Sequence, residues 1–263
     1  MGRWSTTYKE KAVVKSWRAM AIVLALAAAG FLASCDTGGD QAPGADATGS
    51  AVPSSQASSG GATDGSSPRS YEVSGAKALD VRNENGSVRI TVGSGPMSVT
   101  ETLEYGAVKP ATRHRVEGGT LRLVGSGCGN SRPCRVDYVV RVPPATPVTV
   151  RVDNGEAEAD GVTGAVDLGT GNGSVTGTAL GARRASLTSE NGTVEASFEA
   201  APEEVTATTG NGMVTVTVPP GTAYDVRART GVGMRQVSVP TDASSSRRIT
   251  ATTGNGMVTV QTG

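Results

Sequence analysis

The sequence predicts an all-β protein, a single-stranded, β-helix-like solenoid of about seven coils with a flanking antiparallel strand segment. An eleven-residue stretch, TATTGNGMVTV, occurs at 206–216 and again at 250–260. A glycine-containing turn recurs along the chain, at intervals of 18 to 23 residues from Gly155 onward. Apolar and polar residues alternate on both sides of each turn, which is typical of strands with one buried face.

Residues 1–34 are expected to form a lipoprotein signal peptide. Residues 1–18 hold five basic side chains and one acidic side chain, and 19–33 are apolar and uncharged. That stretch is short for a membrane span of about 20 residues, and it fits the apolar part of an export signal. It ends in LASC, which resembles the lipobox of bacterial lipoproteins, whose cysteine receives a diacylglyceryl group. We therefore expect lipidation at Cys35; a plain export signal or an uncleaved anchor are the alternatives.

Two further parts follow the signal peptide. Residues 35–69 comprise the lipidated cysteine and a stretch rich in Gly, Ser, Ala and Pro, in which Val52 is the only apolar residue larger than Ala or Pro. Such a segment cannot bury enough surface to fold, so we expect a disordered tether. Residues 70–263 have the length of one domain. Without the leader, 19 Lys and Arg stand against 23 Asp and Glu, which gives no electrostatic case for nucleic-acid binding.

The remaining two cysteines lie close together in the stretch GCGNSRPC, as Cys128 and Cys134. An exported protein meets an oxidising compartment, so a small disulfide loop is expected. A zinc site is the alternative, but zinc takes about four ligands, and His114 is the single histidine of the chain.

The turns share a glycine, here called the corner glycine, which follows asparagine in six of seven cases. Asparagine and glycine adopt positive φ most readily, so we predict structural turns at these positions. Val232 replaces the asparagine once and should strain that turn or mark a different one. The predicted turn residues are Asn85, Gly86, Asn154, Gly155, Asn172, Gly173, Asn191, Gly192, Asn211, Gly212, Gly233, Asn255 and Gly256.

Four columns around the corner glycine are mainly Val, Ala, Leu and Ile, at seven and five residues before it and two and four after it. They predict a thin core. Asn-Gly between alternating strands is also a strong hairpin signal, so a β-hairpin meander or sandwich is the alternative architecture. The likeness of the successive turns favours stacked coils, in which equivalent residues lie above one another.

Residues 96–143 interrupt the repeat with the alternating runs 97–105, 120–125 and 135–142. We expect longer antiparallel strands there, which flank or cap the first coils, because an uncovered terminal coil exposes an unpaired edge. At the other end, the last repeat is followed by only a few residues, so the final strand is expected to form a bare edge.

The pattern xxTGxGxVxVxxP behind a lipoprotein leader resembles the bacterial β-strand-repeat family named "putative adhesins", whose biochemical function is unknown. The resemblance covers about 70–263, and the stretch at 114–143 is similar to that of actinobacterial members. It implies a surface-exposed β-solenoid and brings no catalytic residues. Many relatives carry aspartate after the corner glycine, whereas this chain has Ser, Glu, Thr or Met there, so an acidic ladder is not expected.

Candidate chemistry is sparse, and we expect no catalytic residues, metal or cofactor. A catalytic triad would need a nucleophile and an acid beside His114, and no G-x-S-x-G motif is present; an exposed strand or turn residue is expected instead. Glu84, Asp153 and Glu190 share the position two residues before the corner glycine. They suggest a weak calcium site, for which solvated turn carboxylates are the simpler alternative.

Met213, Met234 and Met257 follow three corner glycines and should point outward, which suggests an apolar binding ridge. Both tryptophans lie in the leader, so stacked aromatic binding sites are not expected. The sequence thus predicts a non-catalytic adhesion, binding or scaffolding protein, exported and anchored to the outer face of the cell membrane. Its predicted partners are the membrane and an unknown protein or envelope polymer. A signalling or envelope-stress accessory protein is the first alternative, and a glycan-acting enzyme the second.

Overall fold

A computed structural model describes residues 68–263, which form sixteen strands, so the signal peptide, Cys35 and nearly all of the tether lie outside the described residues. Over 68–263, no helix has the length and apolarity needed to cross a membrane. The strands are β1 (Arg69–Val73), β2 (Ala78–Asn85), β3 (Val88–Val92), β4 (Met97–Tyr105), β5 (Thr112–Glu117), β6 (Thr120–Gly125), β7 (Cys134–Val142), β8 (Val148–Asn154), β9 (Ala157–Asp160), β10 (Val166–Asn172), β11 (Val175–Leu180), β12 (Arg184–Asn191), β13 (Val194–Phe198), β14 (Glu204–Val218), β15 (Asp225–Ser238) and β16 (Arg248–Thr262).

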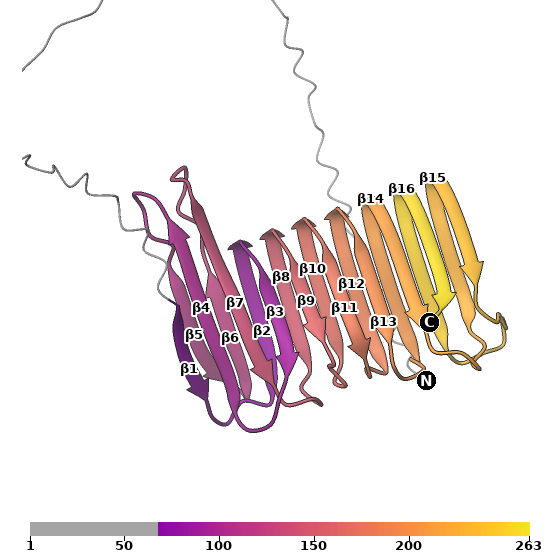
Figure 1. The fold of residues 1–263 in the computed structure, drawn as a ribbon, viewed down its shortest axis with the longest axis horizontal. Helices are drawn as coiled ribbons and strands as arrows, with labels where there is room; N and C mark the ends of the chain where they lie inside the picture. The colour runs from indigo at the N-terminus through magenta and orange to yellow at the C-terminus, as the bar shows by residue number, and fades with distance from the viewer. Residues whose placement is uncertain (1–67) are drawn as a thin grey trace, which may run out of the picture. The chain divides into compact units, whose positions relative to one another are not determined.

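Each of the first four coils has one strand before its corner glycine and one after it, and these strands stack into two layers (Figure 1). In the first layer β2, β8, β10 and β12 pair in parallel, and in the second β3, β9, β11 and β13 do the same. Asn85, Asn154 and Asn172 are in register. Parallel pairing between successive repeats confirms the β-solenoid and contradicts the hairpin alternative, in which consecutive strands run antiparallel.

The last three coils are single long strands that pass through the corner. The first half of β14 pairs with β12, and its second half pairs with β13. β14 therefore belongs to both layers. β15 and β16 have the same form, with the corner glycines Gly233 and Gly256 in register.

These last coils are not stacked in chain order, because β16 lies between β14 and β15 (Figure 1). The duplicated stretches therefore pair residue for residue, from Thr206 with Thr250 to Val216 with Val260. The expectation that the final strand forms the bare edge is wrong, since β15 is the end strand.

Arg235 gives a physical reason for this order. It occupies the inward column in which Val214 and Val258 are fully buried. An interior coil would take its guanidinium out of water at a cost of several kcal/mol. In the end coil, Arg235 is exposed.

The opposite end of the solenoid is built from 97–142 and β1. β4 pairs antiparallel with β7 and β1, and β5 pairs antiparallel with β6. However, β6 and β7 continue the two layers in parallel, on β2 and β3. The expectation of antiparallel strands beside the coils is therefore correct for β4, and it holds on one side of the runs 120–125 and 135–142, which pair antiparallel with β5 and β4. On their other side these two runs extend the solenoid in parallel by a further coil, which was not expected.

The core lies between the two layers and is made largely of Val, Leu and Ala from the four predicted columns. The exceptions lie in the end strand, where Val226 is half-buried and Val237 is exposed. A fifth inward column, three residues before the corner glycine, is polar. Its members are Asn83, Thr170, Ser189, Thr209, Thr230 and Thr253, with Val152 as the apolar one.

Candidate functional site

The corner glycines form a column in which each coil touches the next. Gly212 has a φ of 145°, and a Cβ atom there would lie 2.0 Å from the carbonyl oxygen of Gly192. The same close approach recurs at every corner from Gly155 onward. Glycine is therefore required twice, for its positive φ and for the absence of a side chain.

The corner asparagines form a hydrogen-bonded ladder rather than positive-φ turns. Each Nδ2 donates to the Oδ1 of the asparagine in the preceding coil, at 2.9–3.2 Å, through five bonds from Asn85 to Asn255. None of them has positive φ, so the predicted reason for asparagine is wrong. Val232 likewise has no positive φ and pairs in register with Asn255. The predicted strain is absent, and Val232 simply ends the ladder.

A second ladder comes from the polar inward column, which sequence reasoning missed. The hydroxyl of Thr170 donates to the carbonyl of Gly155 at 2.9 Å, and that of Thr209 donates to Gly192 at 2.9 Å. Ser189, Thr253 and Thr230 make the same bond to the neighbouring corner glycine, at 3.1–3.2 Å. The sequence feature that indicates this ladder is the Ser or Thr that recurs three residues before the corner glycine.

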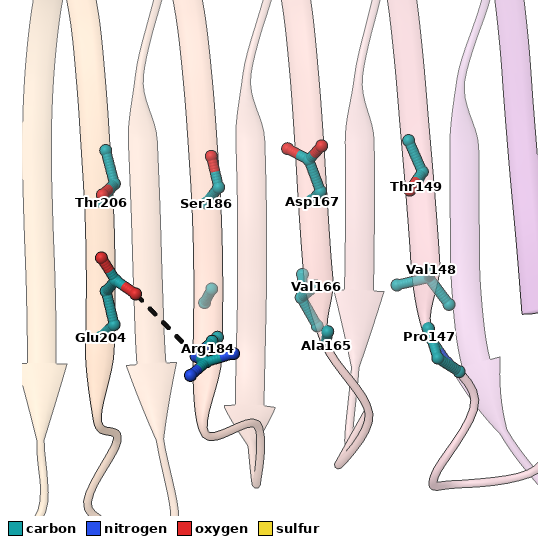
Figure 2. Close-up of a pocket in the computed structure, with 11 residues that line it drawn as sticks. Pro147, Val148, Thr149, Ala165, Val166, Asp167, Arg184, Ser186, Glu204 and Thr206 are labelled. Atoms are coloured by element: carbon teal, nitrogen blue, oxygen red, sulfur yellow. Dashed lines mark ion pairs between the residues drawn. The ribbon is translucent and has the colours of Figure 1, made fainter. Parts of the chain in front are cut away.

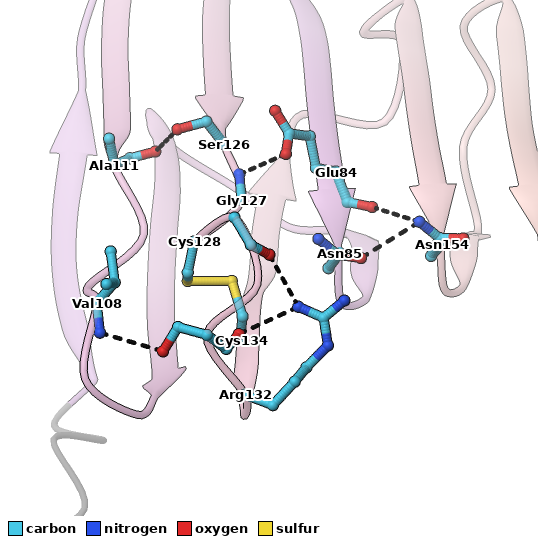
Figure 3. The surroundings of a disulfide bond; sticks show 12 residues. Glu84, Asn85, Val108, Ala111, Ser126, Gly127, Cys128, Arg132, Cys134 and Asn154 are labelled. Atoms are coloured by element: carbon cyan, nitrogen blue, oxygen red, sulfur yellow. Dashed lines mark hydrogen bonds between the residues drawn. A yellow bond between two sulfur atoms is a disulfide. The ribbon is translucent and has the colours of Figure 1, made fainter.

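The predicted disulfide between Cys128 and Cys134 is present, with Cα atoms 5.8 Å apart, and it closes the loop between β6 and β7 (Figure 3). Arg132 stabilises this loop by donating to the carbonyl groups of Gly129 and Ser131, at 3.2 and 3.1 Å. Glu84 connects the loop to the first coil, since its Oε2 accepts from the Gly127 N–H at 2.6 Å. The loop is therefore a structural element of the N-terminal end.

The acidic column proposed for calcium is broken. Glu84 accepts the hydrogen bond from the disulfide loop, and Gly171 separates Asp153 from Glu190. Over 68–263, no three His, Cys, Asp or Glu side chains are grouped as a metal site would require. His114 is exposed in β5, and its ring stacks on Tyr71 of β1 with centroids 4.5 Å apart. This stack connects the outermost strands of the two layers at the N-terminal end. Burial, and then the charge of Glu101, raise the pKa of Tyr71 to about 12.

A groove follows β10 on the outer face of the first layer. Two neighbouring depressions, which share Asp167 and Ser186, run from the start of β10 to its corner. The groove exists because two outward positions of β10 are Gly169 and Gly171, and because β12 places the small Ser186 beside Asp167 and Thr188 beside Gly169. Figure 2 shows the lower part, where the outward side chains stand in rows across four strands.

Charged side chains border and cross this groove. Arg151 extends over Gly169 and pairs with Asp167, with Nη2 2.6 Å from Oδ2. At the lower border Arg184 and Glu204 pair at 3.9 Å (Figure 2). The groove is thus open and has more carboxylates than guanidinium groups, because its lining includes two arginines, Arg151 and Arg184, and four acids, Asp153, Asp167, Glu190 and Glu204. Its exposed lining is more apolar than polar, and hydroxyl, carboxylate and guanidinium groups along it are available for hydrogen bonds.

The three outward methionines are brought together by the unexpected strand order. Met257 is in register with Met213 on one side and with Met234 on the other. Met213 is 42 % exposed and Met234 is 70 % exposed, and Val232 beside it is 69 % exposed. We call these four residues the methionine corner. The sequence suggested the ridge, and the fold makes it continuous over adjacent coils.

The charges at the base of the last coils also alternate in space. Arg184, Glu204, Arg248 and Asp225 follow one another across β12, β14, β16 and β15. Arg248 donates to Asp225 at 2.9 Å, and this hydrogen bond, together with Arg227, holds the pKa of that carboxyl below its ordinary value. This row stabilises the stack of coils.

Comparison with known proteins shows the fold. The chain is similar to the crystal structure of a "putative cell adhesion protein" from Clostridium sporogenes, at 16 % identity and a TM-score of 0.50, over 75 % of this chain and all of that one. It also matches a "putative adhesin" from Bacteroides fragilis at 13 % identity and a TM-score of 0.40, over 75 % of this chain and 96 % of that one. No family model and no curated protein matches. The chain thus shares its fold with the Clostridium sporogenes structure.

Proposed function

We propose that this chain is a non-catalytic surface protein that binds an extended polar polymer of the cell envelope through the groove along β10. The groove is the observation that carries the proposal. It is open and follows β10 from the base of the coil to the corner, as two neighbouring depressions that meet at Asp167 and Ser186. Catalytic sites are usually enclosed and hold perturbed acids or bases, whereas an extended chain needs an open, hydrogen-bonding surface.

The fold and the ends of the chain support this proposal. The similar solved structure is that of a protein described as a "putative cell adhesion protein", and the disulfide suits an oxidising location outside the cytoplasm. We propose that Cys35 carries the lipid, since a diacylated residue supplies the two chains that stable anchorage needs. The described chain enters the solenoid at β1, at the end opposite to β15, so the groove lies between the anchored end and the free end.

Replacing Ser186 with arginine is expected to weaken binding to purified cell-wall polymer by about tenfold or more, because the longer side chain fills the groove beside Asp167. The matched control is Thr176→Arg, an equally half-buried outward position on the opposite layer. Pull-down of each purified variant with insoluble cell wall measures the effect. Equal binding by the two variants would contradict the groove as the binding surface.

Replacing Cys35 with alanine is expected to move the protein from the membrane fraction to the soluble exported fraction. The reason is that the thiol is the acceptor of the diacylglyceryl group. Cell fractionation followed by immunoblotting measures this, with Cys128→Ala as the control that keeps the lipidated residue. Retention of the Cys35 variant in the membrane would show that another segment anchors the chain.

A crosslinking experiment in the producing cell tests the alternative that the chain is a signalling accessory protein. In-cell crosslinking of the tagged wild type would capture one membrane protein if the chain acts as an accessory factor. Capture that survives Ser186→Arg, together with no binding to cell wall, would replace the polymer-binding proposal.

A further inference from the structure

At the end of the solenoid formed by β14, β16 and β15, the outer edge of β15 is a long unpaired strand edge. β15 pairs with β16 on one side, over the whole stretch from Asp225 to Ser238. On the other side, the segment 240–242 pairs with Tyr224, the residue just before β15 begins. About every second residue of this 14-residue strand thus presents a free backbone N–H and C=O on this edge, because the others bond to β16, and the edge is a template for a further strand.

β15 differs in charge from β14 and β16, the two strands that contain the duplicated stretch. Where β14 and β16 have outward threonines, β15 has Arg227 and Arg229, and where they have buried valines it has Arg235. The only acidic side chain of the strand is Asp225, which Arg227 and Arg248 already engage. Arg227 is thus ion-paired, whereas Arg229 and Arg235 have no ion-pair partner among residues 68–263, and the edge carries net positive charge along an extended backbone.

The same edge is also apolar at alternate positions. Val226 is half-buried, Val237 is 36 % exposed, and both belong to columns that are fully buried in most other coils. Val232 and Met234 of the methionine corner extend this surface at the turn. A further strand paired with the outer edge of β15 would bury these side chains and complete the core of the end coil.

Two occupants from this chain do not fit the edge. In a self-pairing of β15 with a second copy, the arginines of the two copies would lie close together, and like charges on paired strands are destabilising. The tether 36–69 contains Val52 as its only apolar residue larger than Ala or Pro, so it cannot supply alternating apolar side chains. The remaining fit is a strand from another protein.

We propose that the edge of β15 binds an extended segment of a partner protein in which apolar residues alternate with Asp or Glu. Backbone hydrogen bonds would give the affinity, and pairing with Arg227 and Arg229 would give the preference for acidic segments. This site is separate from the groove along β10 and does not depend on the polymer-binding proposal.

The probe is a synthetic peptide with the sequence of 249–262 that carries Thr250→Glu and Thr252→Glu. In β16 these two positions lie opposite Arg227 and Arg229, so the same register on the free edge of β15 places each glutamate beside an arginine. We expect this peptide to bind about tenfold more tightly than its twin with Thr250→Lys and Thr252→Lys. Fluorescence anisotropy with labelled peptide measures both.

The protein variant Arg227→Glu with Arg229→Glu should reverse the preference, so that the lysine peptide binds more tightly. Arg113→Glu with Arg115→Glu on β5, at the other end of the solenoid, is the matched control and should change nothing, as should Ser186→Arg. An unchanged melting temperature shows that the variants fold. Equal binding of both peptides, no binding, or concentration-dependent dimers of the protein that the double variant alters would overturn the proposal.

Discussion

Replacing Gly212 with alanine is expected to lower the melting temperature by about 10 °C or more. The new Cβ atom would lie 2.0 Å from the carbonyl oxygen of Gly192, at a backbone φ of 145°. Positive-φ strain costs about 1–3 kcal/mol and overpacking about as much again, and each kcal/mol shifts the midpoint of a domain of this size by about 2–4 °C. Thermal unfolding followed by circular dichroism measures the shift.

Gly221→Ala is the control for this experiment. Gly221 also has positive φ, at 86°, but no heavy atom lies within 4 Å of the position that its Cβ would take. It should show the cost of the backbone strain alone, about 1–3 kcal/mol. If the two variants melt at the same temperature, the close stacking of the corner glycines contributes nothing to stability.

Replacing Thr209 with valine is expected to destabilise the protein by about 1–3 kcal/mol, although the two side chains have nearly the same shape. Thr209 is 1 % exposed, and its hydroxyl donates to the carbonyl of Gly192 at 2.9 Å. Valine would leave that carbonyl without this donor in a largely buried place. Urea unfolding at constant pH measures the free energy of unfolding.

Two substitutions separate this hydrogen bond from packing. Thr209→Ser keeps the donor and should retain more stability than the valine variant. Thr208→Val changes the neighbouring residue, which points outward, and should have little effect. A valine variant at 209 as stable as the wild type would mean that the hydroxyl ladder is incidental.

The stacking of the coils could be predicted from the sequence because the signal is repeated. Seven corner glycines with small apolar residues at fixed distances define the rows of the core, and the rows are buried in all coils except the end coil, which is that of β15. The N-terminal end carries no such repetition. Nothing in 97–142 distinguishes β4, which runs antiparallel to β7, from β7, which joins the coils in parallel.

The order of the last coils could have been predicted from two residues. Arg235 stands in an otherwise apolar column, and Val232 stands in the asparagine column. In an interior coil, Val232 would remove two amide bonds of the ladder, while at the end it removes one. The same reasoning would have placed the identical stretches 206–216 and 250–260 on adjacent strands, because each side chain then packs against an identical side chain.

The position of β16 also constrains how the protein reaches its native state. A solenoid stacked in chain order can add each coil as soon as it has been synthesised. Here β15 precedes β16 in the chain but pairs only with β16, so residues 225–238 have no native neighbour until 248–262 are available. The C-terminal two coils must therefore assemble together, as one cooperative unit on the preformed edge of β14.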